Sequence, residues 1–195
     1  MTEKSICVFA GSNLGNDPAF PAAAHALGAG LVSRGYGLVY GGASVGLMGI
    51  VADAVLKAGG RVVGVMPQFL ATKEIAHTGL SQLKITASMH ERKEAMAELA
   101  NGFIALPGGF GTVEEFFEVL TWAQLGLHAK PCALLNVSGY YDSLLSFLDT
   151  AVAERLLRPE NRSLVLEASD PNALLDQMQA YTAPAITKWI SIDRT

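Results

Sequence analysis

Residues 103–115, FIALPGGFGTVEE, place a short apolar run, a proline, three glycines and a threonine directly before two adjacent glutamates. The run FIAL predicts a strand, and the segment from Thr112 to Gly126 predicts a helix. Glycines between them let backbone amides converge on an anion, and the start of the helix adds free N–H groups. The stretch therefore predicts a strand, a turn and a helix, with an anion site that has carboxylates close by.

The same alternation of strand and helix continues on both sides of this stretch. Besides the unit above, we expect strands at residues 5–10, 37–41, 61–66, 82–86, 132–137 and 163–166, and helices at 18–33, 46–58, 88–101, 141–157 and from 171 onward. Two helices begin with Asp-Pro, in which aspartate caps the helix and proline takes its first position. Apolar strands that alternate with helices predict an α/β fold whose parallel sheet is covered on both faces.

Length and composition narrow the class of protein. The chain has 195 residues, which fits a single domain over residues 1–195 with a weaker pattern after Tyr181. Hydrophobic residues make up 50% of the chain and charged residues 16%, so a large core is available and disorder is not expected. The net charge of -4 argues against nucleic acid or an anionic membrane as a partner.

Cysteine and histidine usage adds two further exclusions. Cys7 and Cys132 each belong to an apolar run and are expected to be buried strand residues rather than a disulfide. The four histidines show no metal-ligand spacing, so no metal site is predicted. We see no secretory signal pattern and no apolar stretch long enough to span a bilayer, and we expect a cytoplasmic protein.

Three glycine turns follow expected strands. They are AGSN at 10–13, GGASVGLMG at 41–49 and PGGFGTVEE at 107–115. One such turn is most often a plain connection, but three of them favour a nucleotide phosphate site at the carboxyl ends of the strands. No GxxxxGK[ST] motif occurs, and the GAGLVS string at 28–33 lies inside a helical pattern. The candidate binding residues in these turns are Gly11, Ser12, Gly41, Gly42, Pro107, Gly108, Gly109, Gly111 and Thr112.

Charged residues cluster at the starts of two of the expected helices. Thr112 and Glu115 match a capping box, in which each would satisfy a backbone amide of its own helix, and Ser88 and Glu91 match another. Arg92 and Lys93 follow in the first turn of the second helix, where a cation opposes the helix dipole. Such a placement favours a role in phosphate or ribose contact. Met89, at the junction of strand and helix, is a candidate to line the same pocket.

Two separated stretches, MHERK at 89–93 and PGGFGTVEE at 107–115, together resemble the signature of the LOG ("lonely guy") family. The family pattern PGGxGTxxE ends on Glu115, and the upstream arginine of the family falls on Arg92. GGASVGLMG resembles the family's GGGxxGLMG turn, with Ala43 where many members have glycine. The resemblance covers about residues 4–181.

The resemblance implies a Rossmann-like, three-layer αβα fold with a mostly parallel central sheet of about seven strands, and a homodimer. It also implies hydrolysis of the N-glycosidic bond of cytokinin riboside 5'-monophosphates and/or AMP, with no cofactor, releasing free base and ribose 5-phosphate. The phosphate would lie on the amides of Gly108 to Thr112 and on the Thr112 hydroxyl. Glu115 would stabilise the oxocarbenium-like transition state and activate water, Arg92 would clamp the substrate, and Glu114 would have a lesser role.

Other activities on the same scaffold are less well supported by the residues. Similar proteins are also called possible lysine decarboxylases, but that activity requires pyridoxal phosphate and no pattern here marks a Schiff-base lysine. A non-hydrolytic carrier of a nucleotide or of the molybdenum cofactor is the main alternative, and a sensor of AMP-like ligands is a third. The pair Arg92 and Glu115 favours the hydrolase, because a carrier has no need of a carboxylate beside a phosphate.

Overall fold

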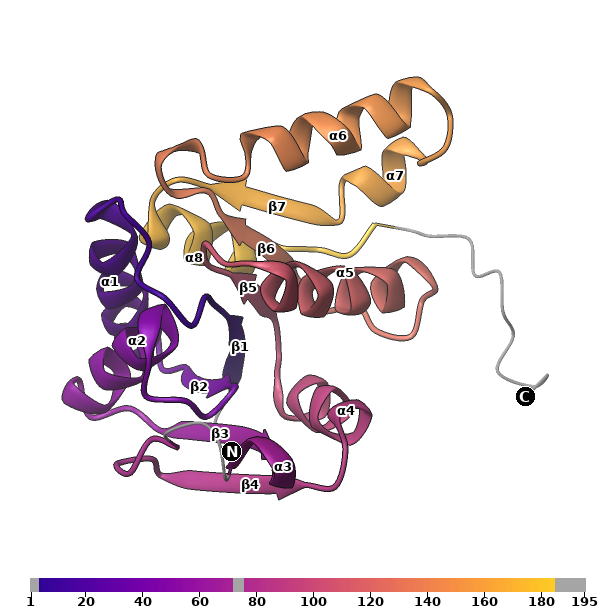
Figure 1. The fold of residues 1–195 in the computed structure, drawn as a ribbon. Coiled ribbons are helices and arrows are strands. Elements are labelled where there is room, and N and C mark those ends of the chain that lie inside the picture. The colour runs from indigo at the N-terminus through magenta and orange to yellow at the C-terminus, as the bar shows by residue number, and fades with distance from the viewer. Residues whose placement is uncertain (1–3, 72–75, 185–195) are drawn as a thin grey trace.

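A single parallel sheet organises the protein. The computed structural model describes residues 4–71 and 76–184. Its seven strands lie in the order β4-β3-β2-β1-β5-β6-β7, and every neighbouring pair is parallel (Figure 1). The strands are β1 (Ser5–Phe9), β2 (Gly37–Tyr40), β3 (Val62–Pro67), β4 (Gln82–Thr86), β5 (Phe103–Ala105), β6 (Cys132–Leu135) and β7 (Val165–Ala168). The predicted α/β class and Rossmann-like layering are confirmed.

Helices cover both faces of the sheet and bury two apolar cores. Three helices pack on one face: α1 (Ala19–Ser33), α2 (Gly46–Lys57) and α8 (Pro171–Ala180). On the other face lie α4 (Met89–Leu99), α5 (Phe110–Gln124) and α6 (Asp142–Ala153). Alternate residues of β1 serve the two cores, with Ile6 and Val8 on the first and Cys7 and Phe9 on the second, because successive side chains of a strand point to opposite faces.

Three short elements complete the chain in connections between the longer ones, namely α3 (Gln68–Ala71), η1 (Val137–Gly139) and α7 (Pro159–Arg162). Because α7 occupies residues that precede the last strand, β7 begins at Val165 rather than at the predicted residue 163. The expectation that residues 1–195 form one domain stays a prediction, and residues 1–3, 72–75 and 185–195 lie outside the described residues.

The predicted Asp-Pro helix start is confirmed at Asp170, which caps α8, whereas α1 begins one residue later than predicted, at Ala19, with Pro18 rather than Asp17 as its N-cap. The Asp17 carboxylate accepts from the Ala19 amide at 2.8 Å, and the Asp170 carboxylate accepts from the Ala173 amide at 2.9 Å. Each satisfies an amide that the first turn of a helix leaves free.

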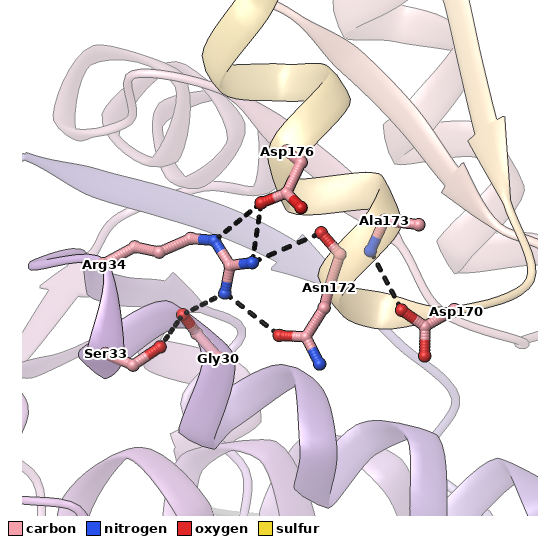
Figure 2. Close-up of polar contacts among 7 residues, drawn as sticks. All are labelled: Gly30, Ser33, Arg34, Asp170, Asn172, Ala173 and Asp176. Atoms are coloured by element: carbon pink, nitrogen blue, oxygen red, sulfur yellow. Dashed lines mark hydrogen bonds and ion pairs between the residues drawn. The ribbon is translucent and has the colours of Figure 1, made fainter.

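Arg34 fastens the C-terminal helix α8 to the end of α1 (Figure 2). Its guanidinium donates to the Asp176 carboxylate at 2.7 Å, to the side-chain oxygen of Asn172 at 3.0 Å and to the Gly30 carbonyl at 3.3 Å. This network lies away from the glycine turns that follow β1 and β5, so we assign it to the stability of the fold.

The order of the strands creates a crevice between β1 and β5. From β1 the chain moves outward through β2 and β3 to β4, then returns to place β5 on the other side of β1. Ligands of open parallel sheets bind beyond the carboxyl ends of the strands at such a reversal. The first and third glycine turns, at 10–13 and 107–115, follow the two strands that flank it.

The structure also shows the state of the cysteines and the features expected to be absent, namely a metal site and a membrane-spanning helix. Cys7 and Cys132 are free and buried, as expected. Within residues 4–71 and 76–184, no group of three or more histidine, cysteine or carboxylate side chains could hold a metal ion. In the same residues, every helix is too short or too polar to cross a membrane.

Candidate active site

Backbone hydrogen bonds join the three glycine turns to one another. The Gly11 amide donates to the Pro107 carbonyl at 3.1 Å, and the Leu47 amide donates to the Gly11 carbonyl at 3.0 Å. A β-carbon added at Gly11 would lie 3.2 Å from that Pro107 oxygen. At Gly46, whose φ is +60°, an added β-carbon would overlap the backbone of Ser12. Glycine is therefore required where the turns cross.

The crevice holds a cavity of about 270 Å³ between the first and third turns. Five of the residues expected to bind the ligand line it, namely Gly11, Ser12, Pro107, Gly108 and Gly109. Gly109 and Gly111 face open space, because a β-carbon added at either would meet no heavy atom within 4 Å in the described structure. The protein itself gives no packing reason for glycine at these two positions, whereas close approach of a ligand to the backbone would.

The predicted capping box at Thr112 is wrong. Helix α5 begins two residues earlier, at Phe110, and its N-cap is Gly109, which offers no side-chain cap. Thr112 is buried inside the first turn, where its side chain fills the space that a β-carbon on Gly108 would need. The amides of this first turn have no partner inside the helix, so this end of α5 can receive an anion.

Glu115 turns its carboxylate to another helix instead of to its own amides. Its Oε1 accepts from Nη1 of Arg92 in α4 at 2.8 Å, and the two side chains are only 12% and 11% exposed. Nε of Arg92 donates to the Val65 carbonyl of β3 at 3.1 Å, which fixes the plane of the guanidinium. The two residues singled out as catalytic are thus brought together, and the arginine is held from two sides.

The second glycine turn makes room for this guanidinium. A β-carbon at Gly41 would lie 2.5 Å from Nη2 of Arg92 and 3.4 Å from Sδ of Met48. Neither Arg92 nor Glu115 lines the cavity, and the second turn connects the two, because Gly41 faces Arg92 while Leu47 lines the cavity. Along α5, five residues separate Glu115 from Phe110, which corresponds to about 7.5 Å of helix rise.

Burial dominates the acidity of Glu115. Removal from water raises the pKa of its carboxyl above the ordinary glutamate value, and Arg92 lowers it by a smaller amount. The nearby charge of Glu114 raises this pKa further. A buried carboxyl whose pKa is raised, in contact with an arginine beside a crevice, is typical of groups that exchange protons in catalysis.

Lys93 belongs to a second ion-pair cluster on the same two helices. Its ammonium donates to Glu114 at 2.6 Å and lies 3.0 Å from Glu118. Burial lowers the pKa of Lys93, but the hydrogen bonds and charges of both carboxylates outweigh this and raise it. The ammonium is therefore held charged, the opposite of what a Schiff-base lysine needs.

Three remaining candidates lie outside the cavity lining. Gly42 is buried with φ of +84°, and its carbonyl accepts from the His77 amide at 3.0 Å. Met89 is the half-buried first residue of α4, and Gly111 is in the first turn of α5. The structure thus separates the candidates that line the cavity from those that surround the ion pair.

Sequence reasoning missed several residues of the cavity wall. Besides the five candidates above, the lining includes Asn13, Leu14, Phe20, Leu47 and Tyr140. Tyr140 donates its hydroxyl to the Gly108 carbonyl at 2.7 Å. It follows β6, the strand next to β5, so the rule that ligands bind at carboxyl strand ends could have identified it.

Fold and site together define a Rossmann-like protein with a buried arginine–glutamate pair beside a glycine-lined crevice. Solved structures share this fold. The molybdenum cofactor carrier protein of Chlamydomonas reinhardtii superposes with a TM-score of 0.67 at 21% identity, over 92% of this chain and 99% of the carrier. A molybdenum cofactor binding protein of Rippkaea orientalis has a TM-score of 0.69 at 23% identity, over 92% of this chain and 98% of its own.

Sequence comparison is more specific than the fold. The cytokinin riboside 5'-monophosphate phosphoribohydrolase LOG1 of Arabidopsis thaliana is 49% identical over 178 residues, covering 91% of this chain and 84% of LOG1. LOG7 of the same plant, which carries the same name, is 51% identical over 91% of this chain and 82% of its own length. The family model described as "Possible lysine decarboxylase" matches residues 48–178. The chain belongs to this family, the LOG family.

Proposed function

We propose that the protein hydrolyses the N-glycosidic bond of nucleoside 5'-monophosphates, namely cytokinin riboside 5'-monophosphates and/or AMP. The products are the free base and ribose 5-phosphate. The observation that carries this proposal is the buried ion pair of Arg92 and Glu115 beside the glycine crevice, with a nitrogen–oxygen distance of 2.8 Å. The names of relatives at about half identity support the same substrate class.

The phosphate would bind where the third turn enters α5. The free amides of the first turn and the positive end of the helix favour a dianion there. Gly109 and Gly111 leave the backbone open to close approach, since their missing β-carbons would meet no other part of the described structure within 4 Å. The buried side chain of Thr112 fills the space beside Gly108 and so supports the turn, and its hydroxyl is the predicted phosphate contact. Anchoring the phosphate at this point fixes the ribose relative to Glu115.

The reaction breaks the bond between C1' and the base nitrogen. The base leaves with the bonding electrons and gains a proton, while the oxygen of water bonds to C1'. Positive charge develops on the ribose in the transition state, and a carboxylate below the ring stabilises it. Glu115 can do this and can accept a proton from the water, because its raised pKa makes it a stronger base than an exposed glutamate.

Arg92 positions the carboxylate and binds the substrate. Its Nη1 and Nε are engaged by Glu115 and by the Val65 carbonyl. The fixed fork of the guanidinium suits contact with a ribose hydroxyl or a phosphate oxygen at the same time. Lys93, also a predicted substrate contact, is held charged between Glu114 and Glu118, so two carboxylates balance its charge. No step in this scheme needs a cofactor.

The carrier reading remains the second candidate because the solved carriers share the fold. At 21% and 23% identity, that likeness concerns the fold alone. A carrier would bind its ligand and release it unchanged. The buried carboxylate beside the crevice supports the hydrolase instead, because a carboxylate repels a bound phosphate and weakens simple retention.

We also infer a homodimer in the cytoplasm. Apolar side chains on the described surface support an interface, since Phe110 is 99% exposed and Leu127 is 61% exposed. Sedimentation at micromolar concentration tests this, and a monomer would contradict it. Two free, buried cysteines fit a reducing compartment. The net charge of -4 gives no support for binding nucleic acid.

The decisive experiment measures base release by chromatography from AMP and from isopentenyladenosine 5'-monophosphate. Wild-type protein is compared with Glu115→Gln, Arg92→Ala and the neighbouring control Glu114→Gln. Release by the wild type that collapses in the first two variants and survives in the third supports the hydrolase, and the ratio of the two rates identifies the preferred base. Tight binding without release from either nucleotide would favour the carrier.

A further inference from the structure

Two consecutive tyrosines hold the segment that joins β5 to α5. Tyr141 is 2% exposed, and its hydroxyl donates to the Leu106 carbonyl at 2.6 Å. Tyr140 is 45% exposed, and its hydroxyl donates to the Gly108 carbonyl at 2.7 Å. The first bond fixes the end of the strand inside the core. The second reaches the turn itself, at the wall of the cavity.

We propose that Tyr140 is a positioning residue for the anion site: its hydroxyl holds the peptide between Gly108 and Gly109 in the orientation that the bound phosphate requires. This inference rests on the proposed function. The peptide unit is planar and trans, so the Gly108 carbonyl and the Gly109 amide point in opposite directions. A hydrogen bond that fixes the carbonyl therefore also fixes the direction of the amide.

The peptide needs such a restraint because both of its residues are glycines. Glycine has the widest choice of backbone angles, and a pair of them can rotate the intervening peptide at little cost. Gly109 is exposed, and nothing in the described structure lies within 4 Å of the position of its missing β-carbon. Ordering this peptide before the ligand arrives removes part of the entropy cost of binding.

Tyr140 is itself held firmly enough to act as a restraint. Its ring meets Phe20 of α1 edge-on at 5.5 Å and Tyr141 at 5.0 Å. The turn before it is shaped by Gly139 and Ser138, both with positive φ. The Asn136 side chain then closes this turn, because it accepts from the Tyr141 amide at 2.7 Å. Packing on two sides of the ring thus places the Tyr140 hydroxyl beside the turn at 107–115.

The pair of tyrosines supplies its own control. Tyr140→Phe and Tyr141→Phe each remove one hydroxyl that donates to a carbonyl of the same segment. Both are measured in the Glu115→Gln background, which prevents turnover, by calorimetric titration with AMP and with adenosine. We expect Tyr140→Phe to weaken AMP binding about three- to tenfold. Adenosine, which lacks the phosphate, should bind Tyr140→Phe as it binds the parent.

Tyr141→Phe should lower the melting temperature and leave both affinities unchanged, because its hydroxyl is buried away from the cavity. The inference is overturned if Tyr140→Phe binds AMP as the parent does. It is also overturned if adenosine affinity falls equally, or if Tyr141→Phe loses as much AMP affinity. Each of these results would make the Tyr140 bond a general structural contact.

Turnover separates this inference from the proposed function. In the wild-type background, Tyr140→Phe should raise KM for the nucleotide by the same factor and change kcat by less than about twofold, because the hydroxyl acts on binding. If the wild type releases no base and Tyr140→Phe still loses AMP affinity, the hydrolase proposal fails while the positioning role stands. A wild type that binds neither AMP nor isopentenyladenosine 5'-monophosphate would overturn both.

Discussion

Consecutive residues form two of the ion pairs that join α4 to α5. Arg92 and Glu115 make the first pair, with side chains 11% and 12% exposed. Lys93 and Glu114 make the second, in which the glutamate is 54% exposed. Each step along a helix turns the side chain by about 100°, so a neighbour in sequence faces a different environment. The comparison teaches that two cation–carboxylate pairs on the same two helices can serve different roles, because they differ in burial and in the groups around them.

The largest difference should appear when each glutamate is neutralised. Glu115→Gln and Arg92→Ala should each lower kcat/KM about 100-fold or more. The first removes the carboxylate that stabilises positive charge on the ribose in the transition state, and the second removes the guanidinium that positions this carboxylate. Glu114→Gln should lower it less than about threefold, as expected for a half-exposed pair. Initial rates of base release measure all three. Equal losses at both glutamates would remove the distinction between the pairs.

A β-carbon at Gly41 tests whether the activity depends on the position of the Arg92 guanidinium relative to Glu115. Gly41→Ala would press on Nη2 of Arg92, 2.5 Å from the new atom, and displace the guanidinium. We expect a loss in kcat of up to about 100-fold from misplacement alone. The double variant with Arg92→Ala should be no slower than Arg92→Ala by itself, since both changes act through one group. Additive losses in the double variant would place the effect of Gly41 elsewhere.

The pH dependence of the rate sharpens the same comparison. Glu115 must be ionised to act, and burial raises its pKa above the ordinary value for glutamate. The acid limb of the kcat/KM profile should therefore fall at a higher pH than an exposed glutamate would give. Because the charge of Glu114 raises this pKa, Glu114→Gln should move the limb to lower pH. A limb that moves to higher pH, or stays in place, contradicts this coupling.

The ion pair of Arg34 and Asp176, which lies outside α4 and α5, gives the smallest effect. Arg34→Ala removes the contacts to Asp176, Asn172 and Gly30 that hold α8 against α1, and should lower the free energy of unfolding by roughly 1 kcal/mol. Urea denaturation measures this, and kcat/KM should not change. Arg162→Ala, which removes a single bond to Asp149, is the matched control and should cost less. An equal cost would mean that the extra contacts of Arg34 contribute nothing.

The sheet and the pairing of Arg92 with Glu115 could be predicted from the sequence. The other contacts of these two side chains could not. Ser88 with Glu91 and Thr112 with Glu115 show the same local pattern. Glu91 does fold back on its own helix, where its carboxylate accepts from the Ala87 amide at 2.7 Å. Glu115 reaches across to Arg92. The spacing of residues along the chain cannot tell whether a glutamate caps its own helix or pairs with another helix. That depends on which side chains the folded sheet places next to it.

The hydrogen-bond partner of Tyr140 was beyond prediction for a related reason, although its place after β6 could have marked it as a residue of the cavity wall. Its partner carbonyl, on Gly108, lies 32 residues away in sequence. The two meet only because β6 pairs with β5, and the order of strands is not encoded in either segment alone. By contrast, the start of α8 at Asp170 could be predicted because the cap and its amide are close neighbours in sequence.

The hydrogen bond between Gly11 and Pro107 ties together turns that follow the first and fifth strands of the chain. Between those two turns the chain must build three strands and their helices before the crevice can close. Loop closure over such distances is slow compared with helix formation. After dilution from denaturant, catalytic activity should therefore return later than helical circular dichroism, and it will report the completed assembly of the whole sheet.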